Sequence, residues 1–377
     1  MQLKEKMNYS ERYIQLDSLF SLGKDYHIED SQVDIRFFFF RSNINARKNI
    51  FFLSEQDRRI SENSFFAYPV FCPAGRTVSD NAILLLHGLN ERRWKKYLTW
   101  AEYLCVQTGK PVILFPMAFH INRGPTWWSD PHKLQSSMEI RRGQFADEST
   151  ISFANVALSY RLSENPDRFY LSGRQTLSDI VQLTQTIKKG YHPAFNPNTH
   201  IDIFSYSIGS FLSQTLLMSN PHKLFSNSRL FMFCGGSIFS SMAGISRNIM
   251  DKPSFEKLQD YYIHFFDKSS KIKGLRDKVF KAFNLMIAPD HAPKKREVVF
   301  RHLGDRIRGI SLAKDIVIPY KGIEEAMGKE FTADRVELID FPFHYSHENP
   351  FPTSKTNPSQ LNDAFNRVFS SAANFLR

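Results

Sequence analysis

The segment from His200 to Met218 changes its hydrophobic period near its midpoint. Ile201, Ile203 and Phe204 make a short apolar run with a β-branched bias, which is typical of a buried strand. From Ile208 onwards, apolar residues recur at intervals of three and four, the period of a helix with one buried face. The segment therefore predicts a strand that passes directly into a helix through a sharp turn.

The predicted turn is Ser205-Tyr206-Ser207-Ile208-Gly209. Its central serine, Ser207, has a small residue two positions before it and a glycine two positions after it. A serine at a sharp strand-to-helix turn stands clear of the sheet, where its hydroxyl can attack a carbonyl carbon. Its neighbours must be small because the turn is strained and two backbones approach closely there. Gly209 meets this requirement. Ser205 stands where the usual G-x-S-x-G pattern has its first glycine, but it is also small. Ser207 is the candidate nucleophile.

Short apolar runs predict further strands on both sides of this turn. Three runs near the N-terminus follow one another without intervening helices, which predicts an antiparallel start to the sheet; they cover residues 33–41, 49–53 and 64–71. Strands and helices then alternate, which predicts parallel strands joined by right-handed crossovers. These strands are expected at residues 82–86, 111–115, 200–204, 229–234, 308–312 and 336–341. The helices are expected at residues 94–104, 151–162, 177–187, 208–216, 322–328 and 358–376.

Two segments interrupt the alternation, at about residues 116–170 and 238–300. Active-site residues of open α/β sheets gather at the carboxyl ends of strands, so the first segment is expected to border the site. The second contains an apolar stripe with basic edges at residues 271–286. Such a helix can lie on a membrane, but a cap over the active site is the favoured interpretation. The predicted organisation is an N-terminal extension with the first strands at 1–63, followed by one domain at 64–377.

Composition and charge exclude several classes of function. The net charge is +11, yet the basic residues are scattered and no zinc-finger or RNP-like pattern is present, so nucleic-acid binding is not expected. Three isolated cysteines indicate neither a disulfide framework nor a metal cluster. The N-terminus lacks the apolar region of a signal peptide, and no run is long enough to span a bilayer. A soluble, cytoplasmic protein is expected, and its oligomeric state stays open.

A serine hydroxyl needs a base to take its proton and a carboxylate that orients the base. Ser207, Asp315 and His347 occur in the order serine, acid, histidine, and each follows a predicted strand. Asp315 is preferred as the acid over the expected loop residues, which are Asp290 and Asp305. His347 is preferred as the base over His344, which lies closer to the last strand, and over His120, which precedes the serine.

With these motifs, the chain resembles the α/β-hydrolase superfamily over roughly residues 64–377. His87-Gly88 after a strand is similar to the superfamily's oxyanion-loop motif, and Asp315 in D-I-V-I-P resembles its acid. The resemblance implies a mostly parallel sheet flanked by helices, with cap insertions. It also implies an oxyanion hole formed by the backbone N–H of Ile208 and that of Leu89 or Asn90.

Five side chains are candidates for contacts with the substrate: His87, Arg123, Trp127, Trp128 and Tyr206. A surface ion pair is the alternative for Arg123, and core packing is the alternative for the two tryptophans. No subfamily is indicated.

These features together predict a serine hydrolase that transfers an acyl group to water through a covalent acyl-enzyme. An ester with an apolar acyl or alcohol part is the expected small-molecule substrate, on the basis of the 14% aromatic content. Neither a metal nor an organic cofactor is expected. Two alternatives remain: a binding protein on a hydrolase fold that lacks catalysis, and a lipase that uses residues 271–286 at a membrane surface.

Overall fold

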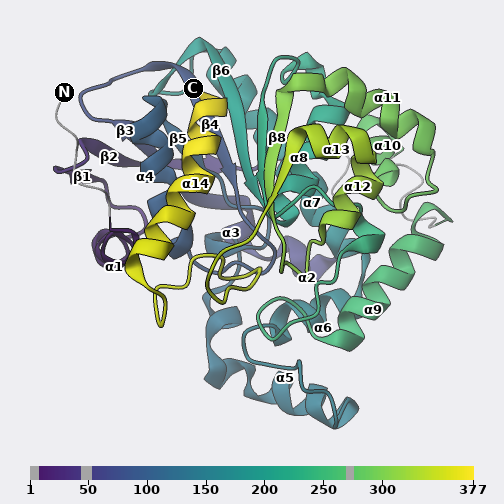
Figure 1. The fold of residues 1–377 in the computed structure, drawn as a ribbon. Coiled ribbons are helices and arrows are strands. Elements are labelled where there is room, and N and C mark those ends of the chain that lie inside the picture. Colours follow the sequence, from purple (N-terminus) through teal and green to yellow (C-terminus); the bar gives the residue numbers. More distant parts are fainter. Residues whose placement is uncertain (1–7, 44–52, 269–275) are drawn as a thin grey trace.

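A nine-stranded sheet forms the centre of the molecule (Figure 1), and its strand order is β1-β2-β3-β5-β4-β6-β7-β8-β9. The computed structural model describes residues 8–43, 53–268 and 276–377. The strands are β1 (Tyr26–Ile28), β2 (Val33–Arg41), β3 (Phe65–Pro73), β4 (Ser79–Leu86), β5 (Val112–Leu114), β6 (Phe195–Tyr206), β7 (Leu230–Phe233), β8 (Ile307–Leu312) and β9 (Val336–Ile339).

The sheet changes from antiparallel to parallel pairing at β5. Strands β1, β2 and β3 pair antiparallel with their neighbours, as does β3 with β5, whereas every pair from β5 to β9 is parallel. The predicted antiparallel start and parallel continuation are both confirmed. The strand predicted at residues 49–53 lies, except for Leu53, outside the described residues.

Helices cover both faces of the sheet, each through its own apolar core (Figure 1). One face carries α1 (Tyr9–Leu19), α4 (Lys95–Thr108) and α14 (Pro358–Leu376). The other carries α7 (Asp167–Lys188), α8 (Ile208–Ser219), α10 (Lys278–Leu285), α11 (Pro293–Leu303) and α12 (Tyr320–Met327). Shorter helices are α2 (Glu55–Arg58), α3 (Ser61–Ser64) and α13 (Lys329–Arg335). The fold therefore has three layers, helices–sheet–helices.

The two interrupting segments pack against each other. They contribute α5 (Pro131–Gln144), α6 (Val156–Glu164) and α9 (Lys252–Asp260), which lie together at the bottom of Figure 1. A buried ion pair joins them, since Arg141 Nε lies 2.6 Å from Asp251 Oδ2. Helix α5 is not predicted from the sequence because it is mostly polar and buries only Leu134, Met138 and Arg141.

Helix α10 packs on α8 and buries its apolar face. Phe283 and Met286 are buried and Val279 is half-buried, while Lys278 and Lys281 are exposed. The described part of this stretch therefore packs its apolar side on α8 and turns its lysines outward. The N-terminal part of the predicted stripe, at residues 271–275, lies outside the described residues.

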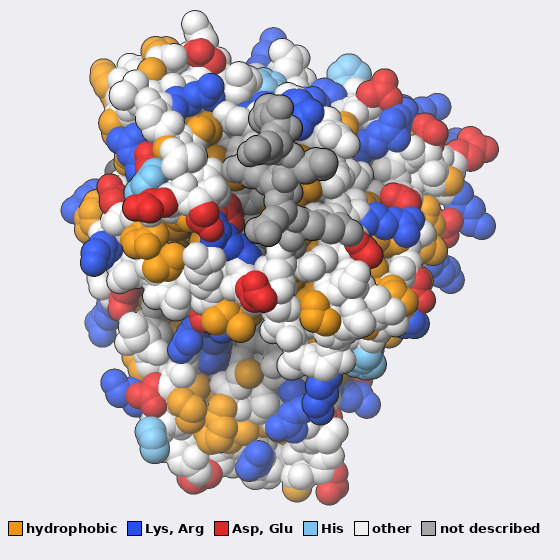
Figure 2. Space-filling model, turned by 60° about the vertical axis from the view of Figure 1, so that its left-hand side comes forward, with side chains coloured by type: hydrophobic (Ala, Val, Ile, Leu, Met, Phe, Trp, Pro, Cys, Tyr) orange, Lys and Arg blue, Asp and Glu red, His pale blue; other side chains and the backbone are white. Residues whose placement is uncertain are grey.

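The sheet order, the change from antiparallel to parallel pairing at β5 and the turn between β6 and α8 together define an α/β-hydrolase fold. On the face shown in Figure 2, acidic and basic side chains are interspersed, and hydrophobic side chains form small separate groups. Among the described residues, no helix combines the length and apolarity needed to cross a membrane.

Candidate active site

The backbone of Ser207 is strained. Its φ of 56° and ψ of −127° lie outside the backbone conformations that residues other than glycine prefer, and α8 begins at the next residue. This geometry is expected of a nucleophile at a strand-to-helix turn, since it turns the hydroxyl away from both elements. Ser207 directly follows β6, a strand in the middle of the sheet.

Ser205 and Gly209 allow the turn to close. Ser205 is buried, and its hydroxyl lies 3.0 Å from that of Ser210 on α8, so its polar group has a partner inside the turn. A Cβ at Gly209 would lie 2.7 Å from the carbonyl oxygens of Leu86 and His87, closer than atoms pack. Glycine is therefore required at the second small position, whereas serine suffices at the first.

Ser207, His347 and Asp315 form one chain of hydrogen bonds. Ser207 Oγ lies 2.7 Å from His347 Nε2, and His347 Nδ1 lies 2.7 Å from Asp315 Oδ2. All three residues are buried. Because a carboxylate only accepts hydrogen bonds, Nδ1 carries the proton, and Nε2 is left with the lone pair that can accept the serine proton.

Asp315 is fixed by its own loop. Its other carboxylate oxygen, Oδ1, accepts hydrogen bonds from the backbone N–H groups of Val317 and Ile318, each at 2.9 Å. The rival acids lie elsewhere: Asp290 is exposed, and Asp305 pairs at the surface with Arg335. Asp315 is thus the carboxylate that the fold brings to the histidine.

His347 is the imidazole that the fold brings to Ser207. Its ring stacks on that of Tyr206, with centroids 5.4 Å apart, and the Tyr206 hydroxyl donates a hydrogen bond to the His347 carbonyl oxygen. His344, the rival, is exposed. His120, the third histidine considered, lies in a pocket wall and donates through Nδ1 to the Ala118 carbonyl oxygen.

The loop after β4 lies beside the turn. Asn90 has a positive φ of 60°, and its side-chain amide donates to the carbonyl oxygens of Ala154 and Asn248, each at 2.7 Å. The Gly88 N–H donates to the Tyr97 hydroxyl at 3.0 Å, which also fixes this loop. Ile208 is the first residue of α8, so its N–H has no acceptor within the helix. The backbone groups predicted to bind an oxyanion therefore lie on two adjoining segments.

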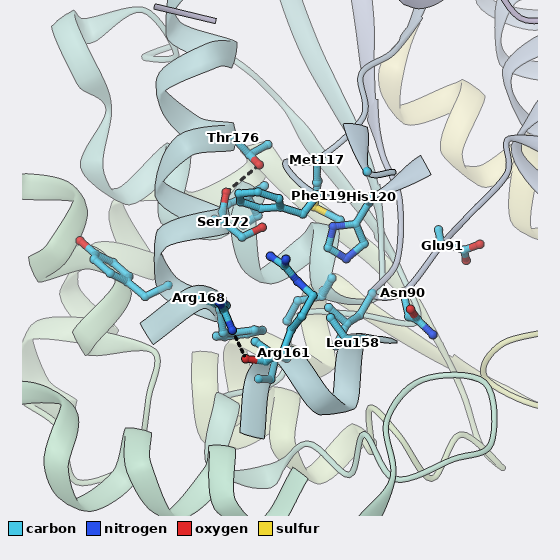
Figure 3. Close-up of a pocket in the computed structure, with 18 of the residues that line it drawn as sticks. Asn90, Glu91, Met117, Phe119, His120, Leu158, Arg161, Arg168, Ser172 and Thr176 are labelled. Carbon is cyan, nitrogen blue, oxygen red and sulfur yellow. Dashed lines mark hydrogen bonds between the residues drawn. The ribbon is translucent and has the colours of Figure 1, made fainter. Parts of the chain in front are cut away.

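A largely apolar pocket adjoins these segments. Leu89, Asn90 and Ile208 line one end of it, and helices α6, α7, α8 and α10 supply most of the other walls. It encloses about 1120 Å³ of space between atoms, including the part open to solvent. Figure 3 draws 18 of its residues and labels ten of them, among them Phe119, His120, Leu158 and Arg161. A pocket of this kind suits an apolar ligand of moderate size.

The structure corrects part of the predicted set of substrate contacts. Trp128 lines the pocket, but the other four candidates do not. Arg123 is fully buried and pairs with Asp179 at 2.7 Å, because the loop after β5 folds back on α7. It therefore anchors this loop and lies outside the pocket lining. Burial lowers the pKa of Arg123, although Asp179 opposes this shift.

His87, Trp127 and Tyr206 also lie outside the pocket lining. His87 is fully buried; its Nε2 accepts from the Met117 N–H at 2.9 Å, and burial holds its pKa well below the ordinary value. It therefore joins the loops after β4 and β5 as a neutral ring. Trp127 is 43% exposed and lies outside the pocket lining, and Tyr206 supports the histidine loop as described above.

The sequence did not reveal which residues of the interrupting segments face the pocket. Arg161 is one example: it lies on a helix that was predicted, but its side chain enters the pocket between aromatic rings. Nothing in its local sequence distinguishes it from a surface arginine. Within the described part of the chain, no cluster of three or more histidine, cysteine or carboxylate side chains has the arrangement of a metal site.

Comparison with protein families gives one match of nearly full length. A model described as "Family of unknown function (DUF6051)" covers residues 7–377. Among curated proteins, none matches the sequence significantly.

Several solved esterase structures resemble the chain over most of its length. A thermostable esterase from Pseudomonas putida is 8% identical, with a TM-score of 0.49 over 98% of this chain and 89% of that one. The esterase of Pyrobaculum calidifontis is 8% identical, with a TM-score of 0.46 over 97% and 89%. Carboxyl esterase 2 from Tuber melanosporum is 8% identical, with a TM-score of 0.46 over 99% and 98%. Matches this distant do not bear on the reaction, so any chemistry has to be inferred from the site itself.

Proposed function

The chain belongs to the family of unknown function DUF6051, and we propose that it is a serine hydrolase that cleaves a carboxylic ester through an acyl-enzyme. The observation that carries the proposal is the chain of hydrogen bonds from Ser207 through His347 to Asp315, with the serine on a strained turn. Such a chain gives an otherwise weak nucleophile a base of fixed tautomer.

In the first half of the reaction, Ser207 Oγ attacks the ester carbonyl carbon while His347 Nε2 takes the hydroxyl proton. The negative oxygen that forms is stabilised by the N–H of Ile208 and by that of Leu89 or Asn90. Asp315 stabilises the imidazolium. His347 then gives its proton to the leaving alkoxide, the C–O bond of the ester breaks, and an alcohol departs from the acyl-enzyme.

In the second half, water replaces the alcohol. His347 takes a proton from the water as its oxygen attacks the acyl carbon, and the same N–H groups stabilise the second tetrahedral intermediate. Collapse of that intermediate breaks the bond to Ser207, whose oxygen recovers the proton from His347. The net products are a carboxylic acid and an alcohol. The apolar pocket beside Ile208 supports a substrate with an apolar acyl or alcohol part.

Labelling and turnover together test this proposal. The wild-type protein is expected to react with a fluorophosphonate at Ser207 and to hydrolyse para-nitrophenyl esters. Ser207→Ala should abolish labelling and lower kcat on the order of 10⁴- to 10⁶-fold, since no acyl-enzyme can form. His347→Ala should cost about as much, and Asp315→Asn somewhat less.

Ser226→Ala is the matched control, because Ser226 is an exposed serine away from the pocket. It should leave both labelling and turnover unchanged. A wild-type protein that neither reacts with the fluorophosphonate nor turns over any acyl substrate would contradict the proposal. The binding-protein alternative would then take its place.

A further inference from the structure

His120 lines the apolar pocket and carries an acceptor without a partner among the described residues. The residue is 9% exposed and lines the cavity, and its Nδ1 lies 2.9 Å from the Ala118 carbonyl oxygen. A carbonyl oxygen only accepts, so Nδ1 carries the proton and Nε2 carries a lone pair. Nε2 is buried, and no described residue gives it a hydrogen bond. A buried polar atom without a partner is costly, so its presence in a pocket wall calls for a ligand that donates.

The surroundings of His120 keep its ring neutral. Burial lowers its pKa to about 4, and the cations of Arg123 and Arg161 act in the same direction, against the hydrogen bond to Ala118. At neutral pH the ring therefore has one donor, already used, and one free acceptor. Nε2 cannot donate to a ligand under these conditions.

Arg161 supplies donors to the same wall of the pocket. Its guanidinium carbon lies 4.3 Å from the ring centroid of Trp128 and 5.0 Å from that of Phe119. Among the described residues it makes one ion pair, from Nη2 to Asp57 Oδ1 at 2.9 Å, and Asp57 also accepts from Arg168. Figure 3 shows His120, Phe119 and Arg161 around one part of the pocket. A guanidinium carries five N–H donors, so this single contact leaves others for a ligand.

From His120 and Arg161 together we infer that the pocket recognises a hydroxyl group on the apolar part of the ester substrate. This inference rests on the proposed function. A hydroxyl donates to His120 Nε2 and accepts from the Arg161 guanidinium, so it forms a hydrogen bond with each side chain. An alkyl group leaves Nε2 without a donor and uses none of the remaining N–H groups of Arg161. A carboxylate has no proton for Nε2, and an ammonium group is repelled by Arg161. The remaining lining is mostly apolar and suits the carbon chain that carries the hydroxyl.

Matched substrates test the inference. The probes are para-nitrophenyl hexanoate, octanoate and decanoate, each compared with its terminally hydroxylated and terminally carboxylated counterpart. At one chain length or more, the wild-type protein is expected to favour the hydroxylated ester over the plain one by about 10- to 100-fold in kcat/KM, because a site built for a hydroxyl discriminates against analogues that lack it. Equal rates, or a preference for the methyl or carboxylate end at every length, would overturn the inference.

Two substitutions of His120 separate recognition from folding. In His120→Asn the amide can keep the hydrogen bond to Ala118 but does not extend to the Nε2 position, so the preference should fall to near onefold. In His120→Gln an amide oxygen can occupy the Nε2 position, so part of the preference should return. His132→Asn, the same change at an exposed histidine on α5, should leave the preference at its wild-type value. A preference that survives in His120→Asn would contradict the assignment.

Binding to the Ser207→Ala protein separates this inference from the proposed function. Calorimetry with the octanoate and hydroxy-octanoate esters should give a dissociation constant about 10-fold lower for the hydroxylated ester. If the wild-type protein hydrolyses no ester but this difference is found, the proposed function fails and hydroxyl recognition stands. If esters are hydrolysed and both bind equally, hydroxyl recognition fails and the proposed function stands.

Discussion

Tyr206 holds the loop that carries His347. Its ring stacks on the imidazole at an interplanar angle of 15°, and its hydroxyl donates to the His347 carbonyl oxygen. Burial raises the pKa of this phenol well above its ordinary value, so the hydroxyl keeps its proton and remains a donor. Tyr206 is therefore a positioning residue: it acts on Ser207 only through the placement of His347.

Removing this hydroxyl should slow the chemistry without changing substrate binding. Tyr206→Phe keeps the stacking and loses the hydrogen bond, so kcat of ester hydrolysis should fall about 5-fold while KM stays near the wild-type value, since about 1 kcal/mol of positioning is lost. Steady-state kinetics measure kcat and KM separately. Tyr103→Phe is the control, because that hydroxyl pairs with Ser370 on α14. An unchanged kcat in Tyr206→Phe would show that the loop is fixed by other contacts.

At the scale of elements, the β6–α8 turn and the loop after β4 are in direct backbone contact. The first turn of α8 passes the carbonyl groups of Leu86 and His87 so closely that Gly209 has no room for a side chain. His87 then ties the same loop to the segment after β5 through the Met117 N–H. Three loops at the carboxyl edge of the sheet are thus locked to one another around Ser207.

A methyl group at Gly209 should push these loops apart. Gly209→Ala is expected to destabilise the protein by about 1 to 3 kcal/mol, the usual cost of overpacking, and to lower kcat/KM because the Ile208 N–H moves relative to the loop after β4. Gly143→Ala on α5 is the matched control. Nothing lies within 4 Å of a Cβ there, so the variant should gain roughly 0.5 to 1 kcal/mol from helix propensity.

Urea unfolding and ester kinetics on both variants check this pair. A Gly209→Ala protein of wild-type stability and activity would mean that α8 can shift without disturbing the site.

At the scale of the whole molecule, burial keeps the rings of three histidines besides His347 neutral. Burial lowers the pKa values of His120 and His192 to about 4, and that of His87 well below its ordinary value. His192 is remote from the pocket lining; its Nδ1 accepts from the Ala194 N–H, so its Nε2–H donates to the Tyr68 hydroxyl at 2.8 Å. Each of these rings takes up a proton more readily in the unfolded chain than in the folded protein.

The free energy of unfolding should therefore depend on pH in the acid range. Each histidine binds more protons in the unfolded state between its folded pKa and 6.5, so stability is full above pH 6.5 and is lost as the pH falls towards 4. For His192 the loss amounts to about 3 kcal/mol, from the size of its pKa shift. Urea unfolding at a series of pH values between about 4 and 6.5 measures the slope of the free energy of unfolding against pH.

His192→Gln should reduce this slope relative to the wild-type protein, whatever its own stability at neutral pH. His222→Gln, at an exposed histidine, should keep the wild-type slope. Parallel slopes for the His192→Gln and wild-type proteins would contradict the neutral buried state of this ring.

The sequence by itself determined the fold and the three residues of the Ser207 site. The parallel strands could be predicted because each is a short, continuous apolar run. The central turn could be predicted because the residues two positions before and after Ser207, Ser205 and Gly209, are small. Asp315 and His347 could be chosen because each follows a strand, and parallel strands all end at the same edge of the sheet. For these three residues, the order serine, acid, histidine after successive strands was enough to select them.

The tertiary structure alone decided what surrounds that site. Arg123 follows a strand as Asp315 does, yet it folds inward to Asp179 on α7, far along the chain. Arg161 and His120, which meet in the pocket wall, are 41 positions apart and come from a helix and a loop. Their orientation depends on how the interrupting segments pack on α7, α8 and α10. Such packing is set by contacts between distant segments, and no local pattern of hydrophobic residues encodes it.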